Sequence, residues 1–87
     1  MKKEIEIQES VRKYLEDREI YPFSVIFTNE FNGILSITLY TIDDLNEILD
    51  TLGYKSMCDK SGFTIEKNTL LLSGMALMSF LYNEKKY

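Results

Sequence analysis

Four carboxylates are concentrated in one stretch of the chain, TIDDLNEILD. Asp43, Glu47 and Asp50 are spaced i, i+4, i+7, with Asp44 adjacent, so in a helix the three share one face. Hard cations such as Mg²⁺ and Ca²⁺ need several oxygens around one point, which carboxylates spread along a rigid helix do not provide. We therefore interpret this face either as solvated or as an electrostatic surface that docks onto a basic protein partner, such as one that handles nucleic acid.

Other side chains that carry chemistry are scarce. The chain has no histidine, which removes the commonest general base and metal ligand. Cys58 is the one cysteine, and its neighbour Asp59 does not favour a reactive thiolate, so we predict a structural or inert cysteine. The glycines are isolated and form no phosphate-binding loop. We expect no enzymatic activity, no cofactor and no metal.

The composition is that of a folded, acidic domain. In 87 residues, 45% are hydrophobic and 28% charged, and the net charge is -4. Direct binding to nucleic acid is not expected, because it depends on Lys and Arg that neutralise phosphates. The charges in MKKEIEIQES oppose a secretory signal, and we expect a cytoplasmic protein without membrane contact. Ala and Pro are rare in the sequence, whereas Ile, Lys and Asn are frequent. This bias suggests AT-rich coding, as in a low-GC bacterium or its phage.

The first half of the chain predicts a helix followed by a hairpin. Residues 3–19 carry an amphipathic stripe, and Pro22 ends that helix. The run FSVIFTNEFNGILSITLY favours two strands around Asn32-Gly33. A two-residue turn would mix polar and apolar side chains on both faces, whereas a three-residue loop, residues 31–33, collects the apolar ones on one face. We predict that loop, with Gly33 at positive φ. The predicted apolar face contains Phe23, Val25, Phe27, Leu35, Ile37 and Leu39.

The second half predicts a helix, a hairpin and another helix. Thr41 is the expected N-cap of the acidic helix, with Asp44 as its capping partner, and Gly53 follows its last residue. YKSMC and FTIEK are expected to pair as edge strands around residues 59–62. The buried stripe of the acidic helix is predicted to be Ile42, Leu45, Ile48, Leu49 and Leu52.

The uncharged stretch TLLLSGMALMSFLY is interpreted as the third helix, although TLLLS alone is also compatible with a strand. Its broad apolar face is predicted to enter the core. A narrower face, Leu72, Ala76 and Phe80, is predicted to contact a second copy of the chain, and the competing explanation is that the first helix covers it. The broad face consists of Leu70, Leu71, Met75, Leu77, Met78, Leu81 and Tyr82.

Together these patterns predict a single α+β domain over residues 1–87, in the order α-β-β-α-β-β-α, with a four-stranded antiparallel sheet. The six tyrosines suggest either interface use or AT-rich codons. We expect a small acidic protein-binding module, an inhibitor, antagonist or adaptor. In general character it is similar to small phage-encoded proteins that block host defences and to immunity proteins. The alternative is a homodimer that binds a small ligand in a pocket between its third helices.

Overall fold

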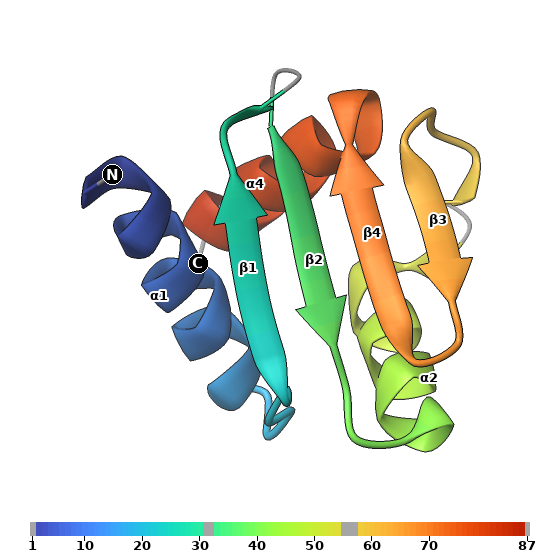
Figure 1. Ribbon diagram of the computed structural model, residues 1–87. Helices are drawn as coiled ribbons and strands as arrows, with labels where there is room; N and C mark the ends of the chain where they lie inside the picture. Colours follow the sequence, from blue (N-terminus) through green and yellow to red (C-terminus); the bar gives the residue numbers. More distant parts are fainter. Residues whose placement is uncertain (1, 31–32, 55–57, 87) are drawn as a thin grey trace.

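The chain alternates single helices with pairs of strands. A computed structural model describes residues 2–30, 33–54 and 58–86. The order of elements and their antiparallel pairing confirm the predicted α+β fold. Along the chain the elements are α1 (Lys2–Glu16), β1 (Ser24–Thr28), β2 (Ile34–Thr38), α2 (Ile42–Leu52), β3 (Phe63–Glu66), β4 (Thr69–Ser73) and α4 (Gly74–Lys86) (Figure 1).

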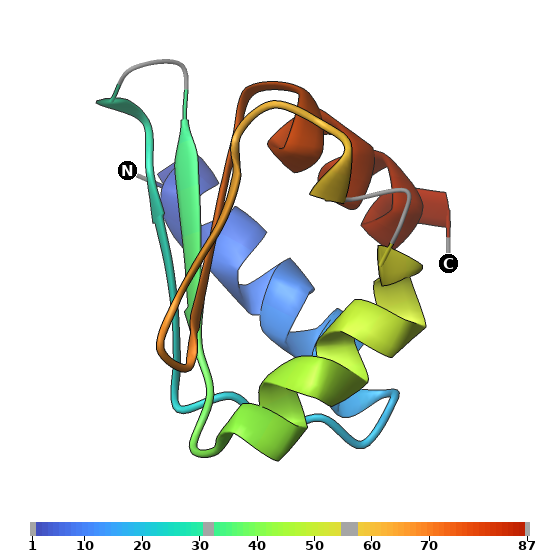
Figure 2. The same cartoon turned by 90° about the vertical axis from the view of Figure 1, so that its right-hand side faces the viewer.

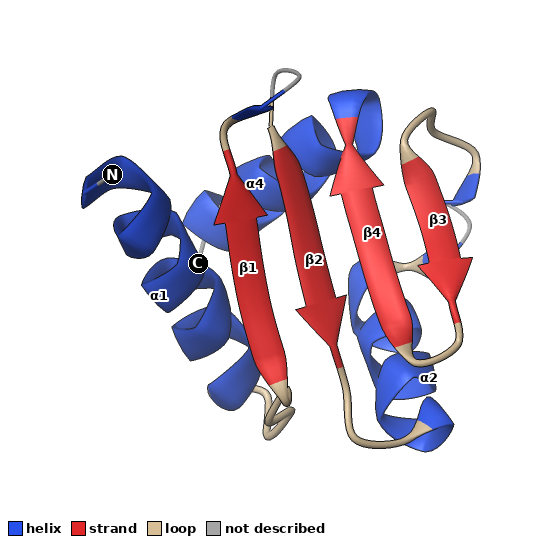
Figure 3. Ribbon diagram, in the orientation of Figure 1, coloured by secondary structure: helices blue, strands red, loops and turns tan. Residues whose placement is uncertain are grey.

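The four strands form one antiparallel sheet in the order β1-β2-β4-β3. Figure 2 shows α1, α2 and α4 on one side of this sheet, and Figure 3 shows the strands in front of α2 and α4, with α1 beside β1. The core therefore lies between one sheet face and the three helices, and the other sheet face is open. The fully buried side chains of the core include Val11, Leu15, Leu35, Ile37, Leu39, Ile48, Leu70, Leu72, Ala76 and Phe80.

The first hairpin has the predicted faces but a different register. Val25 and Phe27 are buried with Leu35 and Ile37, as expected. However, Thr28 pairs with Ile34, so the connection between the strands is longer than the predicted three-residue loop. Residues 31–32 of that predicted loop lie outside the described residues. A shift of two residues returns every side chain to the same face, so the apolar pattern could not distinguish these registers. Gly33 has the predicted positive φ, +104°.

Helix α2 begins and ends where the sequence indicates. Thr41 is its N-cap, and the Thr41 hydroxyl accepts a hydrogen bond from the amide of Asp44 at 3.1 Å. Gly53 is its C-cap with φ +78°. The predicted stripe is buried except at its first member, because Ile42 lies in the opening turn and is exposed.

The second hairpin is formed by different segments from those expected. β3 pairs with β4, Glu66 opposite Thr69, instead of with the run YKSMC. Tyr54 and Cys58 are helical, and residues 55–57 of that run lie outside the described residues. TLLLS supplies Leu70 and Leu72, which are fully buried beside β2, whereas YKSMC has no comparable pair of aliphatic side chains to fill the centre of a sheet.

The last helix consequently begins at Gly74, and its buried face differs from the prediction at several positions, although Leu77 is buried as predicted. Ala76 and Phe80 are fully buried, whereas Met75, Met78 and Tyr82 are 61%, 69% and 68% exposed. The break at Gly74, where φ is +53°, ends the strand and changes the rotation of every later side chain relative to one continuous helix.

Helix α1 ends in a left-handed cap that glycine usually occupies. Glu19 has φ +62°. The amide of Ile20 donates to the carbonyl of Leu15, and the amide of Glu19 donates to that of Glu16, both at 2.9 Å. Ile20 and Leu15 are buried, as expected for the hydrophobic contact of this Schellman motif.

The same helix covers the outer edge of β1 with two side chains. Gln8 Oε1 accepts a hydrogen bond from the amide of Phe27 at 2.9 Å, and Glu4 Oε2 accepts one from the amide of Asn29 at 2.8 Å. These donors point away from β2 and would otherwise be open to another chain. α1 therefore covers the end of β1 nearest Phe27 and Asn29.

Candidate protein-binding surface

The four predicted carboxylates lie on α2, away from the sheet. Asp43, Glu47 and Asp50 are exposed and Asp44 is partly exposed. Among the residues that the structure describes, none of them forms an ion pair. The helix is held by its two caps and by four buried side chains on the opposite face, so these charges are displayed on a rigid support. We call these four residues the acidic face.

The acidic face has no metal-binding geometry. Within residues 2–30, 33–54 and 58–86, no group of three or more Asp, Glu, Cys or His side chains is placed to hold a metal ion. This agrees with the carboxylates following one another along the helix instead of converging.

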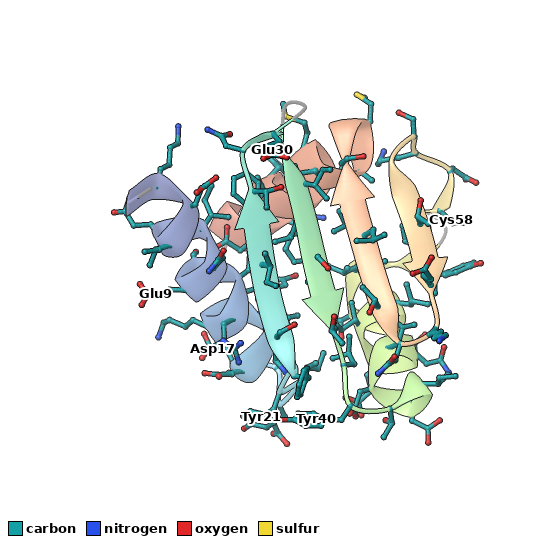
Figure 4. All side chains as sticks on the ribbon, in the orientation of Figure 1. Glu9, Asp17, Tyr21, Glu30, Tyr40 and Cys58 are labelled. Atoms are coloured by element: carbon teal, nitrogen blue, oxygen red, sulfur yellow. The ribbon has the colours of Figure 1, made fainter. Side chains whose placement is uncertain are left out.

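Large apolar side chains are exposed beside the acidic face. Phe23 and Tyr40 make an edge-to-face contact with ring centroids 5.4 Å apart and an interplanar angle of 87°. Tyr21 and Ile42 flank them in the chain, and all four are more than half exposed. Figure 4 shows Tyr21 and Tyr40 at the same end of the sheet. We call these four residues the aromatic patch.

The aromatic patch and the acidic face meet in the chain, where Ile42 is the first residue of α2 and Asp43 the second. Protein interfaces are rich in Tyr and Phe at their centre and polar at their rim. Sequence reasoning missed this patch, because Phe23 and Ile42 matched the buried stripes of their elements. The available signal was position: Phe23 precedes the first residue of β1, and Ile42 lies in the opening turn of α2, where a helix often extends past the core.

Asn68 holds the connection that carries Tyr40 and the start of α2. The amide of Leu39 donates to the Asn68 carbonyl at 2.9 Å, and Asn68 Nδ2 donates to the Leu39 carbonyl. The hydroxyls of Thr38 and Thr69 are also hydrogen-bonded, at 3.1 Å. The turn between β3 and β4 therefore anchors the chain just before the aromatic patch and the acidic face.

The predicted dimer residues are not at the surface. Leu72, Ala76 and Phe80 are fully buried within the chain, so they cannot form the expected interface or border a pocket between two copies. The Phe80 ring contacts Tyr14 of α1 edge to face, with centroids 5.8 Å apart. The first helix therefore covers Phe80, as the competing explanation predicted, whereas Leu72 is buried in the sheet opposite Leu35.

Cys58 is partly buried, whereas most of the described tyrosines are exposed. The Cys58 thiol is partly buried and donates a hydrogen bond to the Asp59 carboxylate at 3.8 Å. Tyr14 is in the core, whereas the other four tyrosines among the described residues are more than half exposed. Tyr87 lies outside the described residues.

A groove of about 300 Å³ lies between α1 and α4. Ile7 and Leu81 provide apolar lining, and Lys3, Glu6, Ser10 and Glu84 provide polar lining. Its volume is at the lower limit of small-molecule sites. It belongs to a single chain and differs from the inter-helix pocket expected for a ligand-binding dimer.

Comparison of the chain with protein-family models, with curated proteins and with solved structures gave no match. Among the described residues, no helix has the length and apolar character needed to span a bilayer.

Proposed function

We propose that this protein acts by protein-protein contact, as a small inhibitor, antagonist or adaptor that docks onto a basic surface of its partner. The observation that supports this most directly is the acidic face of α2, which forms no ion pair with any described residue, together with the exposed aromatic patch. Exposed like charges on a fixed helix give a local negative potential that accelerates association with a positive surface. The aromatic patch supplies the apolar contact that slows dissociation.

A protein that handles nucleic acid is the class of partner that best fits this surface. Its binding groove carries Lys and Arg that neutralise phosphates. A row of carboxylates along a helix can occupy such a groove in place of the phosphates. Inhibition by occupation of this kind is the activity that we propose, and it is the mode expected of phage anti-defence or immunity-like proteins.

The test compares two variants that each lose three negative charges. In the first, Asp43→Asn, Glu47→Gln and Asp50→Asn remove charge from the acidic face. Its matched control changes exposed acids on other elements, Glu9→Gln, Asp17→Asn and Glu30→Gln, whose side chains lie away from α2 (Figure 4).

Proteins retained from a host lysate by the wild-type chain are identified and purified, and binding is then measured by surface plasmon resonance. We expect the α2 variant to associate about tenfold more slowly, with a smaller change in dissociation, and the control to resemble wild type. If the association rate and affinity are the same for the α2 variant as for wild type, and do not change with salt, the acidic face is not the docking surface.

A further inference from the structure

Among the residues that the structure describes, the outer edge of β3 has no neighbouring strand. The amide of Ser73 donates to the carbonyl of Gly62 at 3.0 Å, and antiparallel pairing alternates, so Thr64 and Glu66 direct their main-chain groups towards β4. The amides and carbonyls of Phe63 and Ile65 therefore point away from the sheet. Among the described residues, no partner for these outward groups is found.

The two edges of the sheet differ in whether a helix binds their outward main-chain groups. At the β1 edge, Gln8 of α1 binds the outward amide of Phe27, and Glu4 binds the amide of Asn29 just after the strand. On β3, no helix supplies such acceptors within the described part of the chain. Soluble proteins usually protect an open edge with charges, proline or a bulge, because it is a template for another strand.

The β3 edge also has few of these protecting features. Phe63, Thr64 and Ile65 carry no charge, so Glu66 is the one charged residue of β3, which contains no proline. Ile65 is 39% exposed. Tyr54 is more than half exposed and contacts the Phe63 ring with centroids 6.4 Å apart. An added strand would find unpaired main-chain groups and an adjoining apolar rim.

We propose that β3 pairs antiparallel with β3 of a second copy of this chain, joining two sheets across a two-fold axis. Phe63 then lies opposite the partner's Ile65, and each such pair exchanges two main-chain hydrogen bonds. Thr64 lies opposite the partner's Thr64 on the open face, a favourable cross-strand pair. Glu66 lies opposite the partner's Gly62, which has no side chain, so the acidic residues are not apposed.

This self-complementarity favours a second copy over an unrelated strand, because one short segment provides both halves of each contact and two-fold pairing is the commonest closed symmetry. The contact is small beside the roughly 800 Å² per partner of a stable interface, so the dimer is weak. It uses neither the acidic face nor the aromatic patch. High salt, which weakens docking by the acidic face, should therefore leave this dimer intact.

The test uses sedimentation equilibrium from about 10 μM to about 1 mM, a range suited to a weak dimer. The wild-type mass should rise from 10.2 kDa towards twice that value. Ile65→Pro removes an outward amide without removing a bond to β4, and should stay monomeric. The control Ile65→Val keeps the amide and should dimerise like wild type. A wild-type chain that remains monomeric at the highest concentration overturns the proposal, as does dimerisation of Ile65→Pro.

Amide exchange of the wild-type chain gives an answer that does not depend on the proline variant folding. The outward amides of Phe63 and Ile65 should exchange about tenfold more slowly at the highest concentration, and the already bonded amide of Thr64 should change little. Unchanged exchange at Phe63 and Ile65 overturns the proposal. A second result would also overturn the proposal: the substitution Met78→Lys abolishes the dimer, and the amides of Phe63 and Ile65 are unprotected in the wild-type dimer. That result would place the contact on α4.

Discussion

Replacing Gly62 with alanine should separate the tips of β3 and β4. A Cβ at this position would lie 1.9 Å from the carbonyl oxygen of Ser73 and 2.5 Å from its carbonyl carbon. Real Cβ atoms essentially never come this close to other heavy atoms, and the obstacle is backbone, which cannot rotate away. Relief requires the strands to part, which stretches the bond from the Ser73 amide to the Gly62 carbonyl and the adjoining bond from the Ala76 amide to the Ser61 carbonyl.

The size of the effect follows from three contributions. Gly62 has φ +91°, and a residue with a side chain loses about 1–2 kcal/mol there. Each of the two main-chain hydrogen bonds contributes about 0.5–1.5 kcal/mol. Gly62→Ala should therefore lower the free energy of unfolding by about 2–5 kcal/mol. For a domain of this size that lowers the melting temperature by roughly 10–30 °C.

Gly33→Ala is the internal comparison. Gly33 also has positive φ, but its added Cβ would be 3.2 Å from the side-chain tips of Leu77 and Phe27, which can move by a few tenths of an ångström. We expect a loss of about 1–2 kcal/mol. Urea unfolding monitored by circular dichroism measures both variants. A loss below about 1 kcal/mol for Gly62→Ala, or one no larger than for Gly33→Ala, would refute the reasoning from steric contact.

The remaining predictions concern the helices. Glu19→Gly should stabilise the chain by about 0.5–1 kcal/mol, because glycine adopts the left-handed cap of α1 without strain; an unchanged or lower unfolding midpoint would contradict that account of the cap. Phe80→Ala should lower stability by about 3–5 kcal/mol through the cavity it leaves, whereas Met78→Ala on the exposed face should stay within about 0.5 kcal/mol. Equal effects of these two α4 substitutions in thermal melts would mean that the buried face of this helix is assigned incorrectly.

The parts of the fold that the sequence predicted correctly are those set by local chemistry. Helix α2 is bounded by Thr41 and Gly53, whose capping roles act within a few residues of themselves. The faces of the first hairpin follow from side-chain alternation. Its register does not, because a shift of two residues preserves that alternation and the connection includes residues that the pattern does not constrain.

The errors come from segments whose periodicity is ambiguous. TLLLS is too short for its apolar pattern to distinguish strand from helix, and its pairing with β2 is a long-range contact. Treating it as helix moved Ala76 and Phe80 to the surface and Met78 to the core. For the candidate surface, the sequence placed the acidic face correctly on the exposed side of α2. It missed the aromatic patch, because exposure of Phe23 and Ile42 depends on where the core ends.

Covering of the β1 edge by α1 has a consequence for synthesis of the chain. The segment FSVIFT, rich in β-branched and aromatic residues, resembles sequences that stack into cross-β fibrils when their edges are exposed. Gln8 binds the outward amide of Phe27 in this segment and Glu4 binds that of Asn29 just after it, and both precede it in the chain and emerge first from the ribosome. The nascent polypeptide thus carries the protection for this strand before the strand itself appears, which limits the interval in which neighbouring nascent chains can aggregate through it.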